Sequence, residues 1–230
     1  MNITINTLFW DNLDPRMIES HKAVYDHFDL PVAYTNQNIH HGTWMDNICK
    51  ETDADLIMFC DADCIPLTKD AFTEAVHYCV TTGGFVGPAQ ASNHYGPPIP
   101  SHVFASPAFF MIPKKTYESM GYPSFASVEG RSDVAQEISR KADELGVPYQ
   151  CWYPTKYEKG FKTGNPLGYD KLGNYGRYGI GTVYGNDKIY HLYEGRTGKN
   201  VDRFVQKCSE VVAGTFTSTE MRSSTSLLPE

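Results

Sequence analysis

Residues 55–60, with the sequence DLIMFC, form a nearly continuous apolar run. A strand with one face in water alternates apolar and polar side chains, whereas a strand covered on both faces can be apolar throughout. Other strand patterns occur at residues 2–10, 31–35, 84–87 and 108–112, and they alternate with helical patterns at 15–28, 43–51, 69–81, 132–145 and 201–212. This alternation predicts an α/β fold with a mainly parallel central sheet flanked by helices.

The composition indicates a globular protein. Of the 230 residues, 41% are hydrophobic and 20% are charged, which excludes a disordered or coiled-coil chain. The formal net charge of −7 argues against general binding to the phosphate backbone of nucleic acids. The sequence contains neither an apolar stretch of the roughly 18 residues that cross a membrane nor a basic start followed by an apolar block. We therefore expect a cytoplasmic protein without a membrane span.

The six cysteines are expected to be reduced thiols, because no export signal precedes them. Cys60 and Cys64 flank an acidic turn, so a zinc site there is conceivable. The spacing fits such a site poorly, since no C-x-x-C pair recurs and no nearby histidine completes a tetrahedral set.

Two carboxylates, Asp61 and Asp63, follow the apolar run directly. In a parallel sheet this places them at the carboxyl edge, where ligands collect. Two neighbouring carboxylates repel each other, and a divalent cation removes that repulsion. A plain turn containing Asp is the alternative.

The run DADLIMFCDADCIPLT resembles the DxD region of the GT-A glycosyltransferases, which use nucleotide sugars: an apolar strand, the DxD turn, then a proline before a helix. Haloacid-dehalogenase-like phosphatases also place Asp-x-Asp after a strand. They usually do so on the first strand, with Gly-Thr or Gly-Val following, whereas Cys64 and Ile65 follow here. A nucleotidyltransferase would be expected to carry a Gly-rich phosphate loop after the first strand, and residues 9–12 (FWDN) contain no glycine.

The resemblance implies a GT-A type, Rossmann-like fold over residues 1–212. Residues 1–87 would form the nucleotide-binding half and residues 88–198 the acceptor and lid half. The Gly- and Tyr-rich segment 160–198 is expected to form turns and short hairpins over the site. Residues 213–230 are expected to form a flexible tail.

The same resemblance implies roles for individual residues. Asp63, Asp61 and His191 would bind Mn²⁺ or Mg²⁺, although an isolated histidine is often structural. Asp133, near the start of the helix predicted at 132–145, would be the catalytic base, while Ser132 as a cap or Asp133 on the helix dipole is the alternative. Ser106 and Pro107 would contact the acceptor. The donor would be bound by Thr7, Phe9, Asp11, Asp46, Asp61, Ala62 and Arg196.

The sequence thus predicts a metal-dependent glycosyltransferase. Its partners would be a nucleoside-diphosphate sugar, by class frequency a uridine-linked one, and a glycan or sugar acceptor. If Asp133 takes a proton from the acceptor hydroxyl, displacement inverts the anomeric configuration. A non-catalytic carbohydrate- or nucleotide-binding module is the alternative from a different class.

Overall fold

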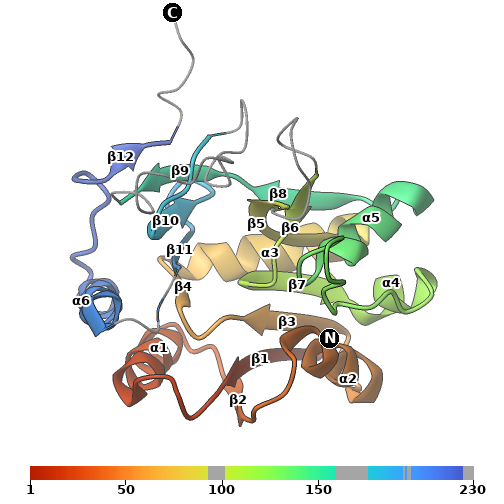
Figure 1. The fold of residues 1–230 in the computed structure, drawn as a ribbon, viewed down its shortest axis with the longest axis horizontal. Helices are drawn as coiled ribbons and strands as arrows, with labels where there is room; N and C mark the ends of the chain where they lie inside the picture. The colour runs from red at the N-terminus through yellow and green to blue at the C-terminus, as the bar shows by residue number, and fades with distance from the viewer. Residues whose placement is uncertain (93–101, 159–175, 194, 196–197, 225–230) are drawn as a thin grey trace, which may run out of the picture.

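The computed structural model describes residues 1–92, 102–158, 176–193, 195 and 198–224 (Figure 1). Its elements follow one another in the order β1 (Ile3–Phe9), α1 (Pro15–His27), β2 (Val32–Asn36), α2 (His41–Glu51), β3 (Leu56–Cys60), β4 (Cys64–Pro66), α3 (Lys69–Thr82), β5 (Phe85–Ala91), β6 (Val103–Ala105), β7 (Phe109–Pro113), α4 (Lys114–Ser119), α5 (Gln136–Leu145), β8 (Tyr149–Trp152), β9 (Pro154–Tyr157), β10 (Gly181–Tyr184), β11 (Ile189–Leu192), α6 (Gly198–Val212) and β12 (Arg222–Ser223).

The central sheet is mainly parallel, as the sequence predicted. Its strands lie in the order β2-β1-β3-β7-β5-β6, and β8 also pairs with β5. Strands β1, β2, β3, β5 and β8 share one direction, whereas β6 and β7 run against them. The carboxyl ends of β1 and β3 therefore lie side by side, and the residues that follow them share one edge of the sheet.

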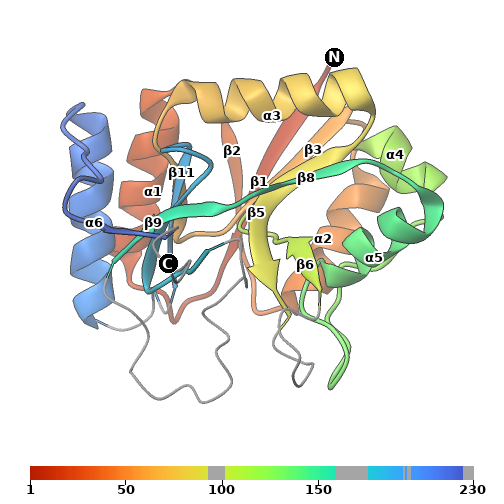
Figure 2. The ribbon, with the colours of Figure 1, turned by 90° about the horizontal axis from the view of Figure 1, so that it is seen from above.

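Strand β3 is apolar throughout because it contributes to two cores. Leu56, Met58 and Cys60 pack in one core with side chains of α1, α3 and α6. Ile57 and Phe59 point the other way, into a second core with side chains of α2, α4 and α5. Figure 2 shows α1 and α6 on one side of the sheet and α2, α4 and α5 on the other. The α/β fold with helices on both faces is confirmed.

A second, antiparallel sheet joins the C-terminal half of the chain to the acidic turn. Its strand order is β12-β9-β10-β11-β4. The described part of the Gly- and Tyr-rich segment forms the β10–β11 hairpin, and residues 160–175 of that segment lie outside the described residues. Strand β4 begins at Cys64, directly after Asp63, so the acidic turn leads straight into this sheet.

Two predicted features differ in the structure. The helix predicted at 132–145 begins at Gln136, because Ala135 has φ +69° and Ser132 forms a bridge with Val128. Ser132 is therefore no helix cap. The described part of the predicted tail packs on the protein: β12 pairs with β9, and Ser218 and Ser224 are buried. Residues 225–230 lie outside the described part. No helix in the described ranges is long and apolar enough to cross a membrane.

Candidate functional site

The turn that carries Asp61 and Asp63 is held by backbone hydrogen bonds at both ends. The Asp61 N–H donates to the carbonyl of Ala108 at 3.0 Å, just before β7. The Cys64 N–H closes the turn by donating to the carbonyl of Asp61 at 2.9 Å. Both carboxylates are partly exposed, each at 26% of the side-chain surface. Strand β3 thus delivers two acidic groups to the sheet edge in a fixed geometry.

His191 reaches this turn through strand pairing. Strands β11 and β4 are antiparallel with His191 opposite Cys64, and the Leu192 N–H donates to the Asp63 carbonyl at 2.9 Å. The register places His191 Nε2 3.5 Å from Asp63 Oδ1. The imidazole is buried, and its Nδ1 has no hydrogen-bond partner among the described residues. A residue far away in the sequence is therefore held against the acidic turn.

Asp61, Asp63 and His191 form a group that could bind a metal ion. Each offers one ligand atom, and these atoms lie within 4.8 Å of one another. Burial raises the pKa of Asp61, and the nearby Asp63 carboxylate raises it further. His41 and His191 each lower it. A divalent cation would relieve the desolvation and the repulsion from Asp63. Two carboxylate oxygens and one imidazole nitrogen suit Mn²⁺ and, less closely, Mg²⁺. The residues fit the ion that the sequence implied.

A second histidine borders the acidic turn. His41 is the first residue of α2, and its Nε2 lies 3.5 Å from Asp61 Oδ1. Its ring lies 5.9 Å, centroid to centroid, from that of buried Trp44. Helix α2 approaches the neighbouring loop closely, because a Cβ on Gly42 would overlap the backbone of Ala126.

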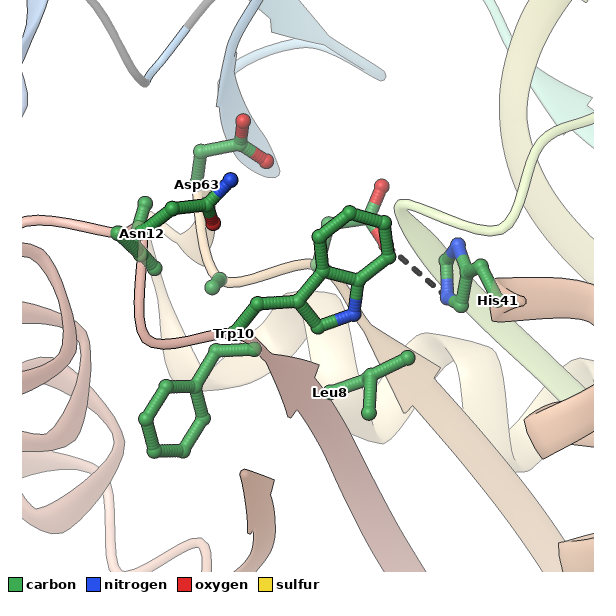
Figure 3. Close-up of a pocket in the computed structure, with 9 residues that line it drawn as sticks. Leu8, Trp10, Asn12, His41 and Asp63 are labelled. Carbon is green, nitrogen blue, oxygen red and sulfur yellow. Dashed lines mark ion pairs between the residues drawn. The ribbon is translucent and has the colours of Figure 1, made fainter. Parts of the chain in front are cut away.

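A cavity of about 180 Å³ opens beside the carboxylates. Figure 3 shows the Trp10 indole rising from the end of β1 into the space between His41 and Asn12, with Leu8 below it. The described lining contains no lysine or arginine, and its one basic side chain is that of His41. The lining residues are Leu8, Phe9, Trp10, Asn12, Leu13, His41, Asp61, Ala62 and Asp63.

The predicted donor residues divide into two groups. Phe9, Ala62 and Asp61 line the cavity. Thr7 is fully buried, and its hydroxyl lies 2.8 Å from Cys60 Sγ, so the prediction that it contacts the donor is corrected to a structural role. Asp11 is exposed next to the cavity-lining Trp10, and it accepts a hydrogen bond of 2.7 Å from Asn36.

Asp46 is a structural residue in this fold. Its carboxylate accepts hydrogen bonds from Ser124 Oγ at 2.6 Å, from the Phe125 N–H at 2.8 Å and from the Tyr117 hydroxyl at 3.3 Å. These three groups lie at or after α4, and Asp46 does not line the cavity. These contacts anchor the 117–125 segment to α2, and none of them tests the donor-binding role predicted for Asp46.

The predicted acceptor and base residues lie on neighbouring segments. Ser106 and Pro107 are buried just before Ala108, whose carbonyl holds Asp61, and Ser106 Oγ has no partner among the described residues. Asp133 is half-buried ahead of α5, and its N–H donates to Gln136 Oε1 at 3.0 Å. None of these three residues lines the cavity, and their roles stay predictions. Arg196 lies outside the described residues.

Sequence reasoning assigned no role to Trp10, His41, Asn12, Leu8 or Leu13, which all line the cavity. Trp10 and Asn12 follow β1, at the same edge as Asp61. His41 starts the helix that follows β2. Their place after two adjacent parallel strands was the signal that could have identified them.

No protein-family model and no curated protein matches the chain. A mannosyltransferase from Pyrobaculum calidifontis, solved with GDP-Man and Mn2+, is 11% identical with a TM-score of 0.47, and the match covers 65% of this chain and 54% of that one. A mutant galactosyltransferase 7 from Drosophila, solved with manganese, UDP-Gal and xylobiose, is 14% identical with a TM-score of 0.46, covering 97% and 83%. The bifunctional IspDF from Campylobacter jejuni is 9% identical with a TM-score of 0.42, covering 66% and 49%.

The chain spans about half the length of the mannosyltransferase and of IspDF. At these identities and TM-scores, the similarities do not determine the reaction or the substrate. Any functional assignment therefore depends on the side chains gathered around the acidic turn.

Proposed function

We propose that this protein is a divalent-metal-dependent glycosyltransferase that uses a nucleoside-diphosphate sugar. One observation carries the proposal: Asp61 and Asp63 after β3 and His191 on β11 converge beside a cavity at the carboxyl edge of a mainly parallel sheet. This combination of ligand atoms and location suits a diphosphate that is bound through a cation. Because the described cavity lining contains no lysine or arginine, such an ion would supply the positive charge that a diphosphate needs.

Asp63 and His191 would hold the ion, and Asp61 would complete its protein ligands or accept hydrogen bonds from ribose or sugar hydroxyls. When bound, Mn²⁺ or Mg²⁺ supplies Lewis-acid neutralisation of the leaving diphosphate. The His191 ring is buried, and its orientation is fixed because β11 pairs in register with β4. The protein thus provides a site that is already assembled before the donor arrives.

The end of β1 would receive the nucleoside. Phe9, Trp10 and Leu13 give this end of the cavity an apolar, aromatic lining, and Asn12 adds an amide that can pair with polar edges. We infer a uridine base from the class resemblance alone. Asp133 would take the proton of the acceptor hydroxyl, and direct displacement would then invert the anomeric configuration.

A thermal-shift experiment tests the proposal. Uridine, guanosine and cytidine diphosphates are each added with and without Mn²⁺, and the expected result is a stabilisation by one nucleotide that requires the ion. Asp63→Ala should lose this stabilisation and metal-dependent transfer, while Asp53→Ala removes an exposed carboxylate elsewhere and should behave as wild type. Wild-type transfer by Asp63→Ala would refute the assignment. Stabilisation by free sugars alone, without ion or nucleotide, would favour a carbohydrate-binding module instead.

A further inference from the structure

Helix α5 presents a row of polar side chains to the residues around β6. Gln136, Ser139 and Asp143 recur at positions i, i+3 and i+7, so they share one face of the helix. Ser139 Oγ accepts a hydrogen bond of 3.2 Å from the Ala105 N–H. His102, just before β6, contacts both ends of the row. Its Nε2 lies 3.1 Å from Asp143 Oδ2, and its Nδ1 lies 3.4 Å from Gln136 Nε2. One imidazole therefore bridges two turns of α5.

One arrangement of protons satisfies these contacts. A carboxylate accepts hydrogen bonds and does not donate them, so the neutral imidazole carries its proton on Nε2, toward Asp143. Its Nδ1 is then an acceptor, and the amide NH₂ of Gln136 is the donor that faces it. The amide oxygen of Gln136 is left to accept the N–H of Asp133, at 3.0 Å. With the amide turned over, two donors would meet at Asp133 and two acceptors at His102.

Gln136 binds both backbone polar groups of Asp133. Its side chain accepts the Asp133 N–H, and its own N–H donates to the Asp133 carbonyl at 3.1 Å. Gln136 is fully buried, so water does not compete for these bonds. The point from which the Asp133 side chain projects is therefore fixed against the first turn of α5.

The turn that leads into α5 needs such support. Ala135 has φ +69°, a left-handed conformation that an L-residue adopts only where its surroundings hold it there. Alanine also has no side-chain oxygen with which to cap the helix. The Ala135 N–H donates to the Phe125 carbonyl at 2.9 Å, which holds one side of the turn. The Gln136 side chain holds the other side, where Asp133 lies.

We propose that His102 is a positioning residue, which orients the Gln136 amide and thereby fixes the backbone that carries the Asp133 carboxylate. This inference rests on the proposed function, in which Asp133 takes the proton of the acceptor hydroxyl. His102 does not line the cavity beside the acidic turn, so its effect on transfer would pass through Asp133. An apolar side chain could pack beside Phe104, on which the imidazole stacks, but it could not hold a buried amide in one orientation.

Two substitutions separate the hydrogen bonds of His102 from its packing. His102→Phe keeps a ring beside Phe104 and removes both nitrogens, whereas His102→Gln keeps a carbonyl oxygen and an NH₂ for the two neighbours. Steady-state sugar transfer gives kcat and the donor KM, and hydrogen exchange is followed by NMR at the Asp133 N–H. We expect His102→Phe to lower kcat by about tenfold or more at an unchanged donor KM, and to speed the exchange by about tenfold. His102→Gln should restore most of both.

Tyr149→Phe is the matched control. The Tyr149 hydroxyl donates to the same Asp143 carboxylate at 3.4 Å, and the ring stacks on Phe85. This variant should transfer sugar like the wild type. If His102→Phe does not fold, Asp143→Ala removes the acceptor that sets the tautomer, at a side chain that is 53% exposed. We expect Asp143→Ala to lower kcat partly, and an unchanged kcat would count against the proposal.

The outcomes separate this inference from the proposed function. If the wild type transfers sugar and His102→Phe does so equally fast, the positioning role alone fails. It also fails if His102→Gln loses as much activity as His102→Phe, or if transfer slows while exchange at the Asp133 N–H stays as in the wild type. If the wild type transfers no sugar, the positioning role falls together with the glycosyltransferase assignment.

Discussion

His41 Nε2 lies 3.5 Å from Asp61 Oδ1, so the first residue of α2 contacts a carboxylate delivered by β3. The contact joins α2, which follows β2, to the turn that follows β3, and β1 lies between those two strands in the sheet. Burial and the neighbouring Asp63 raise the pKa of Asp61, whereas His41 and His191 lower it. The orientation of Asp61 is the property that this arrangement controls.

Removing His41 should weaken metal binding without unfolding the protein. We expect His41→Ala to reduce Mn²⁺ affinity by about tenfold, the lower end for partners that orient a ligand. His40→Ala is the matched control, because the adjacent His40 faces Ser127 Oγ at 3.2 Å and does not contact Asp61. Calorimetric titration with Mn²⁺ measures both. Equal affinities for the two variants would show that His41 does not orient Asp61.

Metal binding should tighten as the pH rises. The pKa of Asp61 is raised above its ordinary value, chiefly by burial, so a proton competes with the ion at a higher pH than it would at an ordinary aspartate. Mn²⁺ affinity is therefore expected to fall as the pH is lowered toward and through the pKa of Asp61. Asp61→Asn cannot ionise, so it should bind more weakly and lose this part of the pH dependence. A wild-type affinity that is constant between pH 5 and 8 in the same titration would leave no role for Asp61 protonation in that range.

His21 should make the native state sensitive to acid. Its pKa is lowered by burial to about 3, whereas an unfolded histidine takes up its proton at about 6.5. Between these values the unfolded chain binds more protons, so the free energy of unfolding falls as the pH drops, by up to about 1.4 kcal/mol per pH unit. Urea unfolding at several pH values compares the wild type with His21→Met. The difference in stability between the two should shrink, or turn in favour of the variant, from pH 6.5 downward.

Asp46 should contribute to stability rather than to donor binding. Asp46→Ala leaves the Phe125 N–H, the Ser124 hydroxyl and the Tyr117 hydroxyl without their shared acceptor. The expected loss is about 1–3 kcal/mol in the free energy of unfolding. Nucleotide affinity, measured where the variant is still folded, should stay within about twofold of wild type. A large loss of nucleotide affinity with unchanged stability would restore the donor role.

The fold was predictable because β3 packs against two cores. Its five consecutive apolar residues are required when Leu56 and Met58 enter one core and Ile57 and Phe59 the other. The same property concealed which side chains of β1 face the site and which face the interior. When both faces of a sheet are covered, apolar and polar side chains do not reveal which residue faces a ligand. Thr7 was assigned to the donor through the family resemblance, although it is buried, and Trp10 was given no role.

Other errors arose where tertiary contacts override a local pattern. The sequence around Ser132 is typical of a helix start, but Ala135 adopts a left-handed conformation while its N–H donates to the Phe125 carbonyl at 2.9 Å. No local signal encodes that distant partner. The approach of His191 to Asp63 could be anticipated only through the family resemblance, because it depends on the β11–β4 register.

Asp133→Asn tests the proposed base. The substitution keeps the size of the side chain and the backbone bond from the Asp133 N–H to Gln136 Oε1, so folding should be preserved. An amide cannot take the proton of an acceptor hydroxyl, and transfer is expected to slow by about 100-fold or more. Nucleotide and Mn²⁺ affinities should be unchanged, because Asp133 does not line the cavity beside the acidic turn. Gln136→Glu, which keeps an acceptor for the same N–H, serves as the control for loop geometry. Should Asp133→Asn transfer sugar at the wild-type rate, the proton must leave by another group and the inference of inversion loses its support.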